Sequence, residues 1–304
     1  METNTQNPVP VQPAQPIQLK KIGRVKGGYL IASGSFKILE KNKSIMLFPL
    51  LALLIDLMII GVCVASYFYS AATGAIDPSA DQESYNNAYY YVGYFLFYVV
   101  TVFIASFFQA GMVAMVNAHL NGHKISFGQG ITAASKISGK ILCWSVVAAT
   151  IGVILNMIAE RFKLVGRIVA KILGATWDIV TFFIVPVLVL EKETVGSSIK
   201  RSAMIFKSKW GETIIATFSV SLFFMLAILG VFCMMLVFFF LTQPSTPVIL
   251  ISAGLFLLFL VAVIIASMAI EGIYRTVLYD YAVNGRIAPA FEPQLITDAV
   301  KTKK

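Results

Sequence analysis

Charge is scarce in this sequence. Asp, Glu, Lys and Arg together make up 13% of the 304 residues, against roughly 25% in a soluble domain. Hydrophobic residues make up 58%, and no polar stretch is long enough to form a soluble domain of useful size. These shortages exclude an ordinary soluble protein and predict that the chain lies in a lipid bilayer.

Signatures of enzymes are also missing. The sequence contains no glycine-rich phosphate loop ending in Gly-Lys-Ser/Thr, no His-Glu-x-x-His, no Gly-x-Ser-x-Gly and no paired-cysteine motif. His119 and His123 have the spacing of metal ligands, but Gly122 interrupts the helix between them and no Cys or acidic residue lies close by. We therefore expect no enzymatic activity, no catalytic residue, no cofactor and no metal.

Cysteine is rare as well. Its three occurrences lie inside apolar runs and lack the spacing of a metal site, so we interpret them as small apolar fillers that form no disulfide. They are Cys63, Cys143 and Cys233.

Long apolar runs dominate the rest of the chain. Each is about 20 residues or more, enough to cross a bilayer core of about 30 Å. None shows the alternation of a barrel strand, so the backbone must form its hydrogen bonds within helices. We predict an all-α fold, a polytopic membrane bundle of six transmembrane helices in three hairpins, with short cytoplasmic interfacial helices. The six predicted spans are 45–69, 89–118, 141–159, 168–190, 213–241 and 248–273.

The chain divides into three parts. Residues 1–28 form a basic tail that is predicted to be cytoplasmic and disordered, because a segment rich in Pro, Gln and Asn cannot bury a core. Residues 29–285 form the transmembrane domain, and residues 286–304 form a cytoplasmic C-terminal tail. From Tyr29 onward, the pattern indicates either an amphipathic helix on the inner leaflet or a charged segment that only orients the first span.

Lysine and arginine are distributed unevenly between the connectors. Twenty of the 24 lie in the N-terminal segment, in the connectors after the second and fourth spans, and in the C-terminal part. Cytoplasmic loops carry the excess of basic residues, so we expect a multi-pass plasma-membrane protein with both termini in the cytoplasm. The net charge of +9 comes mostly from these lysines, which suits anionic inner-leaflet lipid better than nucleic acid.

Short basic segments precede each odd-numbered span. They cover residues 35–43, 133–140 and 202–209, and in each a Ser and apolar residues come before two lysines. The pattern indicates either three repeats of interfacial helix, span, loop and span, or convergence on a common membrane-entry signal.

Four basic residues fall on the outer side against the general rule, namely Arg161, Lys163, Arg167 and Lys171. The last three are spaced four apart and share a helix face; we call them the outer basic stripe. They either bind anionic lipid head groups or draw anionic solutes to the protein, or they only anchor the helix by reaching the interface.

Two carboxylates lie inside predicted spans. From the helical rise of about 1.5 Å per residue, Asp56 and Asp178 reach similar depths, and Asn156 lies near them in depth. A charged, unpaired carboxylate there is costly. The three residues form either an intramembrane polar cluster on a proton or solute path, or hydrogen bonds that join helices. Glu271 and Arg275, four apart in the favoured order, are predicted to form a structural ion pair.

A motif in the centre of the chain carries a resemblance to a known family. It reads Trp177-x-x-x-Thr181-Phe182-Phe183-x-x-Pro186-Val187-Leu188-Val189-x-Glu191, then Arg201-Ser202, then Trp210-Gly211-Glu212, with Leu278-Tyr279-x-Tyr281-Ala282-x-x-Gly285 near the C-terminus. Over residues 35–291 the chain resembles a family of six-span prokaryotic integral membrane proteins with a domain of unknown function. That family has Asn in place of Gln109. More distantly, the arrangement is similar to the membrane domain of glycerophosphodiester phosphodiesterases, whose catalytic domain is missing here.

The resemblance supports the topology and adds little on activity. We expect a non-enzymatic membrane protein that binds or passes a small solute or a lipid through the bundle. The alternative is a structural or accessory subunit that organises lipids or a partner complex, and an intramembrane enzyme ranks third. The expected partners are the bilayer, anionic head groups and a small solute, and the sequence also allows a homo-oligomer.

Overall fold

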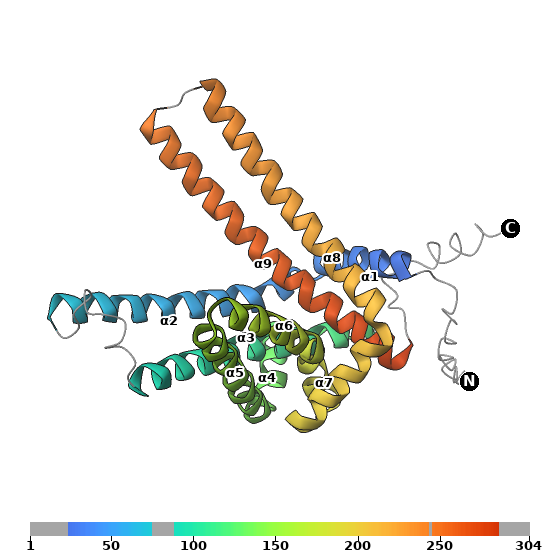
Figure 1. Cartoon of the computed structure of the whole chain (residues 1–304). Helices are drawn as coiled ribbons and strands as arrows, with labels where there is room; N and C mark the ends of the chain where they lie inside the picture. The colour runs from blue at the N-terminus through green and yellow to red at the C-terminus, as the bar shows by residue number, and fades with distance from the viewer. Residues whose placement is uncertain (1–23, 75–87, 243–244, 286–304) are drawn as a thin grey trace, which may run out of the picture.

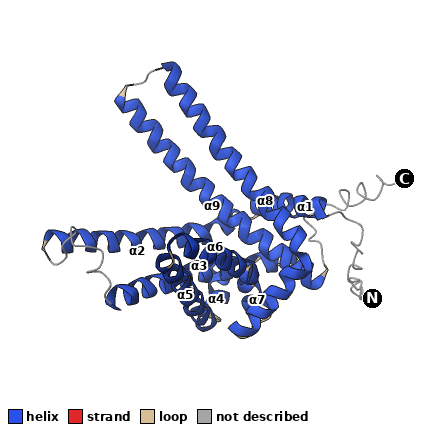
Figure 2. Cartoon of the chain, viewed as in Figure 1, coloured by secondary structure: helices blue, strands red, loops and turns tan. Residues whose placement is uncertain are grey.

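The computed structural model describes residues 24–74, 88–242 and 245–285. Within these ranges the chain forms helices and no strand (Figure 2), which confirms the predicted all-α fold. The α-helices are α1 (Arg24–Lys41), α2 (Leu47–Ala72), α3 (Ala88–Leu120), α4 (Phe127–Ser135), α5 (Ser138–Arg161), α6 (Lys163–Thr181), α7 (Ile184–Leu190), α8 (Val195–Thr242) and α9 (Thr246–Asn284).

Six segments in the described ranges are long and apolar enough to cross a membrane, which agrees with the predicted number of spans. They are Lys43–Ala72, Val92–Leu120, Ser138–Arg161, Val165–Leu190, Val220–Thr242 and Thr246–Asn284.

The spans pair as three hairpins, α2 with α3, α5 with α6, and α8 with α9. In Figure 1 the α8–α9 hairpin and the α2–α3 hairpin project from a shared base in different directions. At the base, α1 packs against α8 and α9, α4 packs against α3, and α7 packs against α3 and α8. The base is therefore the part where all three hairpins meet.

Most of the buried core lies in this base. One cluster of buried side chains includes Phe48, Phe183 and Tyr274, and a second surrounds Trp144 and Leu188. In α9 the buried residues begin only at Ile265 and continue to Asp280, so the first half of this helix remains exposed. Exposed apolar side chains on the projecting parts are what a lipid-facing surface requires.

A pair of glycines allows α4 to approach α3 closely. The backbones of Gly111 and Gly130 face each other, and the ring of Phe48 lies on both. A Cβ atom at Gly130 would lie 2.9 Å from the carbonyl oxygen of Gly111 and 2.7 Å from Cζ of Phe48. The absence of side chains at these two positions therefore fixes the start of α2 against α3 and α4.

The fourth span is not one helix, contrary to the prediction for residues 168–190. It breaks at Phe182 and Phe183, between α6 and α7. Pro186 has no N–H to bond the carbonyl of Phe182, and its ring would clash with that carbonyl in a continuous helix. The N–H of Phe183 instead donates to Oγ of Ser202, at 3.0 Å. Pro186 thus lies in the first turn of α7, where a missing N–H costs little.

The basic segments at the span entrances take different forms. The first lies mainly in α1, and the second begins in the last turn of α4. The third, residues 202–209, is not a separate helix, because α8 runs without interruption from Val195 to Thr242. The helix α1 also begins at Arg24, inside the segment predicted to be disordered; residues 1–23 and the C-terminal tail lie outside the described residues.

The three cysteines, interpreted above as small apolar fillers, lie at the surface of the helices. Cys63, Cys143 and Cys233 are all free and exposed, on α2, α5 and α8. Each lies within a span, so a small weakly polar side chain there faces lipid or a neighbouring molecule rather than a protein core.

Candidate functional site

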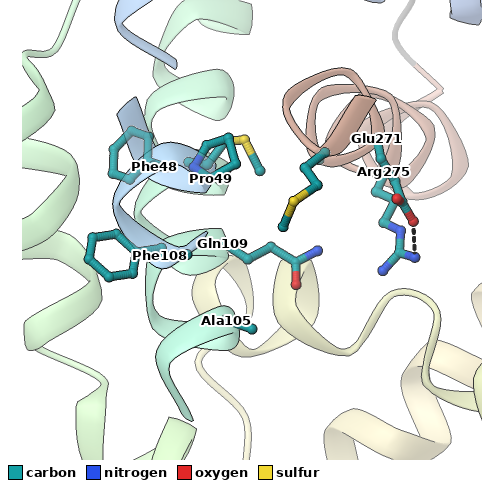
Figure 3. Close-up of a pocket in the computed structure, with 11 residues that line it drawn as sticks. Phe48, Pro49, Ala105, Phe108, Gln109, Glu271 and Arg275 are labelled. Carbon is teal, nitrogen blue, oxygen red and sulfur yellow. Dashed lines mark hydrogen bonds and ion pairs between the residues drawn. The ribbon is translucent and has the colours of Figure 1, made fainter. Parts of the chain in front are cut away.

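A cavity of about 180 Å³ lies between α2, α3 and α9 at the edge of the base (Figure 3). The contributing residues follow helical spacing, because positions three, four and seven apart share one helix face. The lining residues are Phe48, Pro49 and Ala52 from α2, Ala105, Phe108, Gln109 and Met112 from α3, and Met268, Glu271, Gly272 and Arg275 from α9.

Two small or unusual residues line this cavity. Gly272 has no side chain, and a Cβ atom there would overlap the end of Met112. Pro49 lies in the first turn of α2, where its missing N–H needs no helical partner. Apart from Gln109, Glu271 and Arg275, the walls are apolar, with the rings of Phe48 and Phe108 on one side.

The polar groups of the cavity come from α3 and α9. Gln109 extends from α3 toward α9 (Figure 3), and its amide makes no hydrogen bond with any other described residue. Glu271 Oε1 and Arg275 Nη2 form an ion pair, with side-chain exposures of 43% and 26%. Nε of Arg275 is buried and lacks a hydrogen-bond partner in the described part of the chain.

Arg275 also contacts the break between α6 and α7. Its guanidinium lies over the ring of Phe182, 4.5 Å from the centroid, a favourable cation–π geometry. Phe182 itself lines a second groove of about 400 Å³, which also includes Asp178, Thr213 and Thr217. Phe182 therefore contacts Arg275, which lines the cavity, and also forms part of the groove between α6 and α8.

The structure does not join the three residues of the predicted polar cluster to one another. Asp56 is half-buried on α2, one turn beyond Ala52 on the same helix face, and its Oδ1 has no partner among the described residues. Asn156 is exposed on α5 and donates to Oε1 of Glu160 at 2.9 Å. Asp178 is exposed and lines the groove between α6 and α8. The three residues were predicted to lie at similar depth in the membrane, but their side chains do not meet.

The outer basic stripe lies near the beginning of α6. Arg167 and Lys171 are exposed and line a groove of about 390 Å³ together with Asn156. Lys163 is the first residue of α6, and its side chain lies outside the described part of the structure. His119, considered above for metal binding, lies with Nδ1 at 3.3 Å from Nδ2 of Asn42.

A polar network at the base was not predicted, although its residues belong to the motif that carries the family resemblance. Glu191, at the end of α7, accepts hydrogen bonds from Nε of Arg201 at 2.9 and 3.1 Å and from the hydroxyl of Tyr279 at 2.7 Å. We call these three residues the Glu191 clamp. The hydrogen bond to Glu191 raises the pKa of the Arg201 guanidinium above its ordinary value. The clamp ties α7, α8 and α9 together, so this part of the motif has a structural explanation.

Gln109 was also missed as a site residue. Its signal was visible, because it is an amide within an apolar run beside Phe107 and Phe108. A polar residue in such a run faces the bundle interior or a cavity more often than lipid.

The chain matches the model of a known family. Residues 88–289 match the model of a family of unknown function, DUF6159. No curated protein and no solved structure matches the chain, so the distant similarity to glycerophosphodiester phosphodiesterases receives no support. Because the match covers more than half of the 304 residues, the chain belongs to the family of unknown function DUF6159.

Proposed function

We propose that this protein is a non-enzymatic membrane protein that binds a small polar solute or a lipid group within its helical bundle, in the cavity between α2, α3 and α9. The observation that supports it best is the Gln109 amide, which has no hydrogen-bond partner among the described residues and faces the Glu271–Arg275 pair in an otherwise apolar cavity. A chain with these spans is an integral membrane protein. The distribution of Lys and Arg supports an orientation with both termini in the cytoplasm, and the plasma membrane is the location that we propose.

The energetics favour a ligand over a purely structural role. Nε of Arg275 is buried without a partner among the described residues, and such a donor costs about 1–3 kcal/mol. The Gln109 side chain is only half-buried, so its amide remains accessible to a molecule in the cavity. A bound carbonyl, carboxylate or phosphate oxygen could accept from the Gln109 amide and from Arg275. The Glu271 carboxylate could accept from a hydroxyl or an amine.

The size of the cavity limits the ligand. A cavity of about 150 Å³ holds a benzene molecule, so the volume of about 180 Å³ suits a small solute or one polar group of a larger lipid. Ala105 lines the cavity and is exposed, which supports entry from the side of α3. Asp56, one turn farther along α2, extends the polar surface beyond the cavity.

Passage through the bundle would require a second opening. Phe182 supports such a route, because it contacts Arg275 on the cavity side and lines the groove between α6 and α8. A solute moving between the two spaces would pass this ring. Rotation of one aromatic side chain at a helix break is a small change.

The test compares ligands that remain bound to the purified protein, measured by native mass spectrometry and by analysis of an extract. Gln109→Leu removes the amide at similar volume, and Ala105→Phe blocks the entrance. Ala175→Phe introduces the same ring at an exposed site on α6 and is the matched control. We expect the wild type and the Ala175→Phe control to retain a bound molecule, and the Gln109→Leu and Ala105→Phe variants to lose it. Equal retention in all four proteins would contradict the proposal.

A second function, as an accessory subunit that organises lipids or a partner, is favoured by the exposed α8–α9 hairpin. The most apolar stretch of Val220–Thr242 contains no buried residue in the structure as described. Cys233 is exposed there, so oxidation of native membranes tests whether this hairpin meets a second copy. With Cys63 and Cys143 changed to Ser, a disulfide-linked dimer would support the accessory function. A product that remains monomeric would count against a homo-oligomer through this hairpin.

A further inference from the structure

A second candidate site lies at the opposite end of the spans from the base. The groove of about 390 Å³ is lined by the first turns of α3, the last turns of α5 and the first turns of α6. Its polar residues are Tyr94, Tyr98, Asn156, Arg167 and Lys171. Because α4 joins the other ends of α3 and α5, the groove is separated along the helices from the cavity described above.

The shape of the groove is set by one glycine and two tyrosines. A Cβ atom at Gly152 would lie 3.0 Å from Cζ and 3.1 Å from the hydroxyl of Tyr98. The absence of a side chain at Gly152 therefore lets the Tyr98 ring lie directly on α5. The rings of Tyr94 and Tyr98 are stacked, with centroids 6.4 Å apart and an interplanar angle of 14°. The two phenols form one wall of the groove.

The groove is rich in hydrogen-bond donors that have no acceptor among the described residues. Arg167 and Lys171 are exposed and make no ion pair or hydrogen bond with the described residues. The hydroxyls of Tyr94 and Tyr98 likewise have no hydrogen-bond partner in the ranges that the structure describes. No carboxylate from the described part of the chain lines the groove.

Carboxylates do lie nearby, and they define the limits of the site. Oε1 of Glu160 accepts from the amide nitrogen of Asn156, which leaves the Asn156 carbonyl oxygen as an acceptor. Asp178 is close enough to Tyr98 to interact with it electrostatically. Lys171 and Arg167 lie on α6 about two and three turns before Asp178, so positive charge predominates among the groups that line the groove.

Anchoring at the interface does not account for this arrangement. A lysine or arginine that only reaches the head-group region needs neither a groove nor partners on other helices. Here donors from α3 and α6 converge on one concave surface with a rigid aromatic wall. A guanidinium presents two parallel donors to phosphate oxygens, and a lysine adds a point charge.

We propose that this groove binds a phosphate-ester anion through Arg167, Lys171 and Tyr98. The anion could be carried by the head group of a phospholipid or by a soluble phosphate ester. The site is independent of the proposed function, since no residue is shared between the groove and the cavity. Its location near interfacial tyrosines suits a lipid whose chains lie beside α3 and α6.

The test measures ligand-induced thermal stabilisation of the full-length protein in neutral detergent. One arm adds phosphatidylglycerol, with phosphatidylcholine as the comparison lipid, and the other adds soluble glycerol 3-phosphate. The variants are Arg167→Gln with Lys171→Gln, and separately Tyr98→Phe. The matched control is Lys200→Gln with Lys207→Gln, which removes the same charge from two exposed lysines of α8.

We expect the Arg167 and Lys171 double variant to bind its phosphate ester at least about tenfold more weakly than the wild type, equivalent to about 1.4 kcal/mol. Tyr98→Phe should weaken binding about threefold, and the α8 control should bind as the wild type does. Stabilisation by phosphatidylglycerol alone identifies a lipid site, and equal stabilisation by glycerol 3-phosphate identifies a soluble anion. Equal binding by the wild type and the double variant, or an equal loss in the α8 control, would overturn the proposal.

Discussion

The close approach of α3 and α4 leads to the sharpest prediction about stability. In Gly130→Ala, the new methyl group would lie 2.9 Å from the carbonyl oxygen of Gly111 and 2.7 Å from Cζ of Phe48. Carbon atoms in good contact are about 3.5–4.0 Å apart. The carbonyl belongs to the backbone of α3, so relief requires either a shift of α4 or a movement of Phe48.

The magnitude follows from two opposing effects. Overpacking of this kind costs about 1–3 kcal/mol, whereas replacing a helical glycine by alanine contributes about 0.5–1 kcal/mol. Comparison with Gly128→Ala in the same helix isolates the first effect. Its Cβ atom would meet Oγ of Ser126 at 4.0 Å and no closer neighbour among the described residues. Since both variants gain helix propensity, their difference in unfolding free energy should equal the clash, about 1–3 kcal/mol.

The assay is thermal unfolding of the two purified variants and the wild type in the same detergent. In domains of 150–250 residues, a loss of 1 kcal/mol in unfolding free energy lowers the midpoint temperature by about 2–4 °C. Gly130→Ala should therefore unfold several degrees below Gly128→Ala. Phe48 also lines the cavity, and its displacement should weaken the binding of any ligand retained there. A midpoint for Gly130→Ala at or above that of Gly128→Ala would refute the close packing of α3 on α4.

Three further predictions follow from the base and the topology. Ser202→Ala leaves the buried N–H of Phe183 without its acceptor and should lower the unfolding free energy by about 1–3 kcal/mol. Ser197→Ala, at an exposed position, should leave it unchanged, and equal thermal midpoints for the two variants would contradict the hydrogen bond between Phe183 and Ser202. Tyr279→Phe removes a hydrogen bond to the carboxylate of the Glu191 clamp and should lower the unfolding free energy by about 1.5–3 kcal/mol, and an unchanged midpoint would show that the clamp does not hold α9. In a cysteine-free background, Phe162→Cys should react with a membrane-impermeant thiol reagent from outside intact cells; protection there, with labelling from the cytosol, would reverse the topology.

The number of spans and their pairing could be predicted because they depend on local composition. A run of apolar residues long enough for the bilayer is visible without any knowledge of its neighbours, and a short connector forces adjacent spans into a hairpin. The spacing of Glu271 and Arg275 likewise places their side chains on one helix face. These features require only residues that are close in the sequence.

The break in the fourth span was only half visible. Pro186 inside an apolar run favours a kink or an end, and its effect on the carbonyl of Phe182 is local. The hydroxyl that accepts from Phe183 N–H belongs to Ser202 on α8, and a partner on another helix cannot be identified from spacing. The continuity of α8 through residues 202–209 depends in the same way on the helices it packs against.

The cavity shows why depth in the membrane does not identify partners. Counting residues from the interface gives one coordinate of a side chain, and it placed Asp56, Asn156 and Asp178 at a similar level. The direction around each helix gives a second coordinate, and the spread of the hairpins gives a third. Gln109, Glu271 and Arg275 agree in depth, in direction around their helices and in position between the hairpins, because α3 and α9 present faces to the same cavity. The three residues of the predicted cluster agree only in depth. Asn156 lines the groove beside the outer basic stripe, and Asp178 lines the groove between α6 and α8. A polar residue in a span therefore indicates that a cavity or partner exists, whereas the packing of the hairpins decides which residues meet in it.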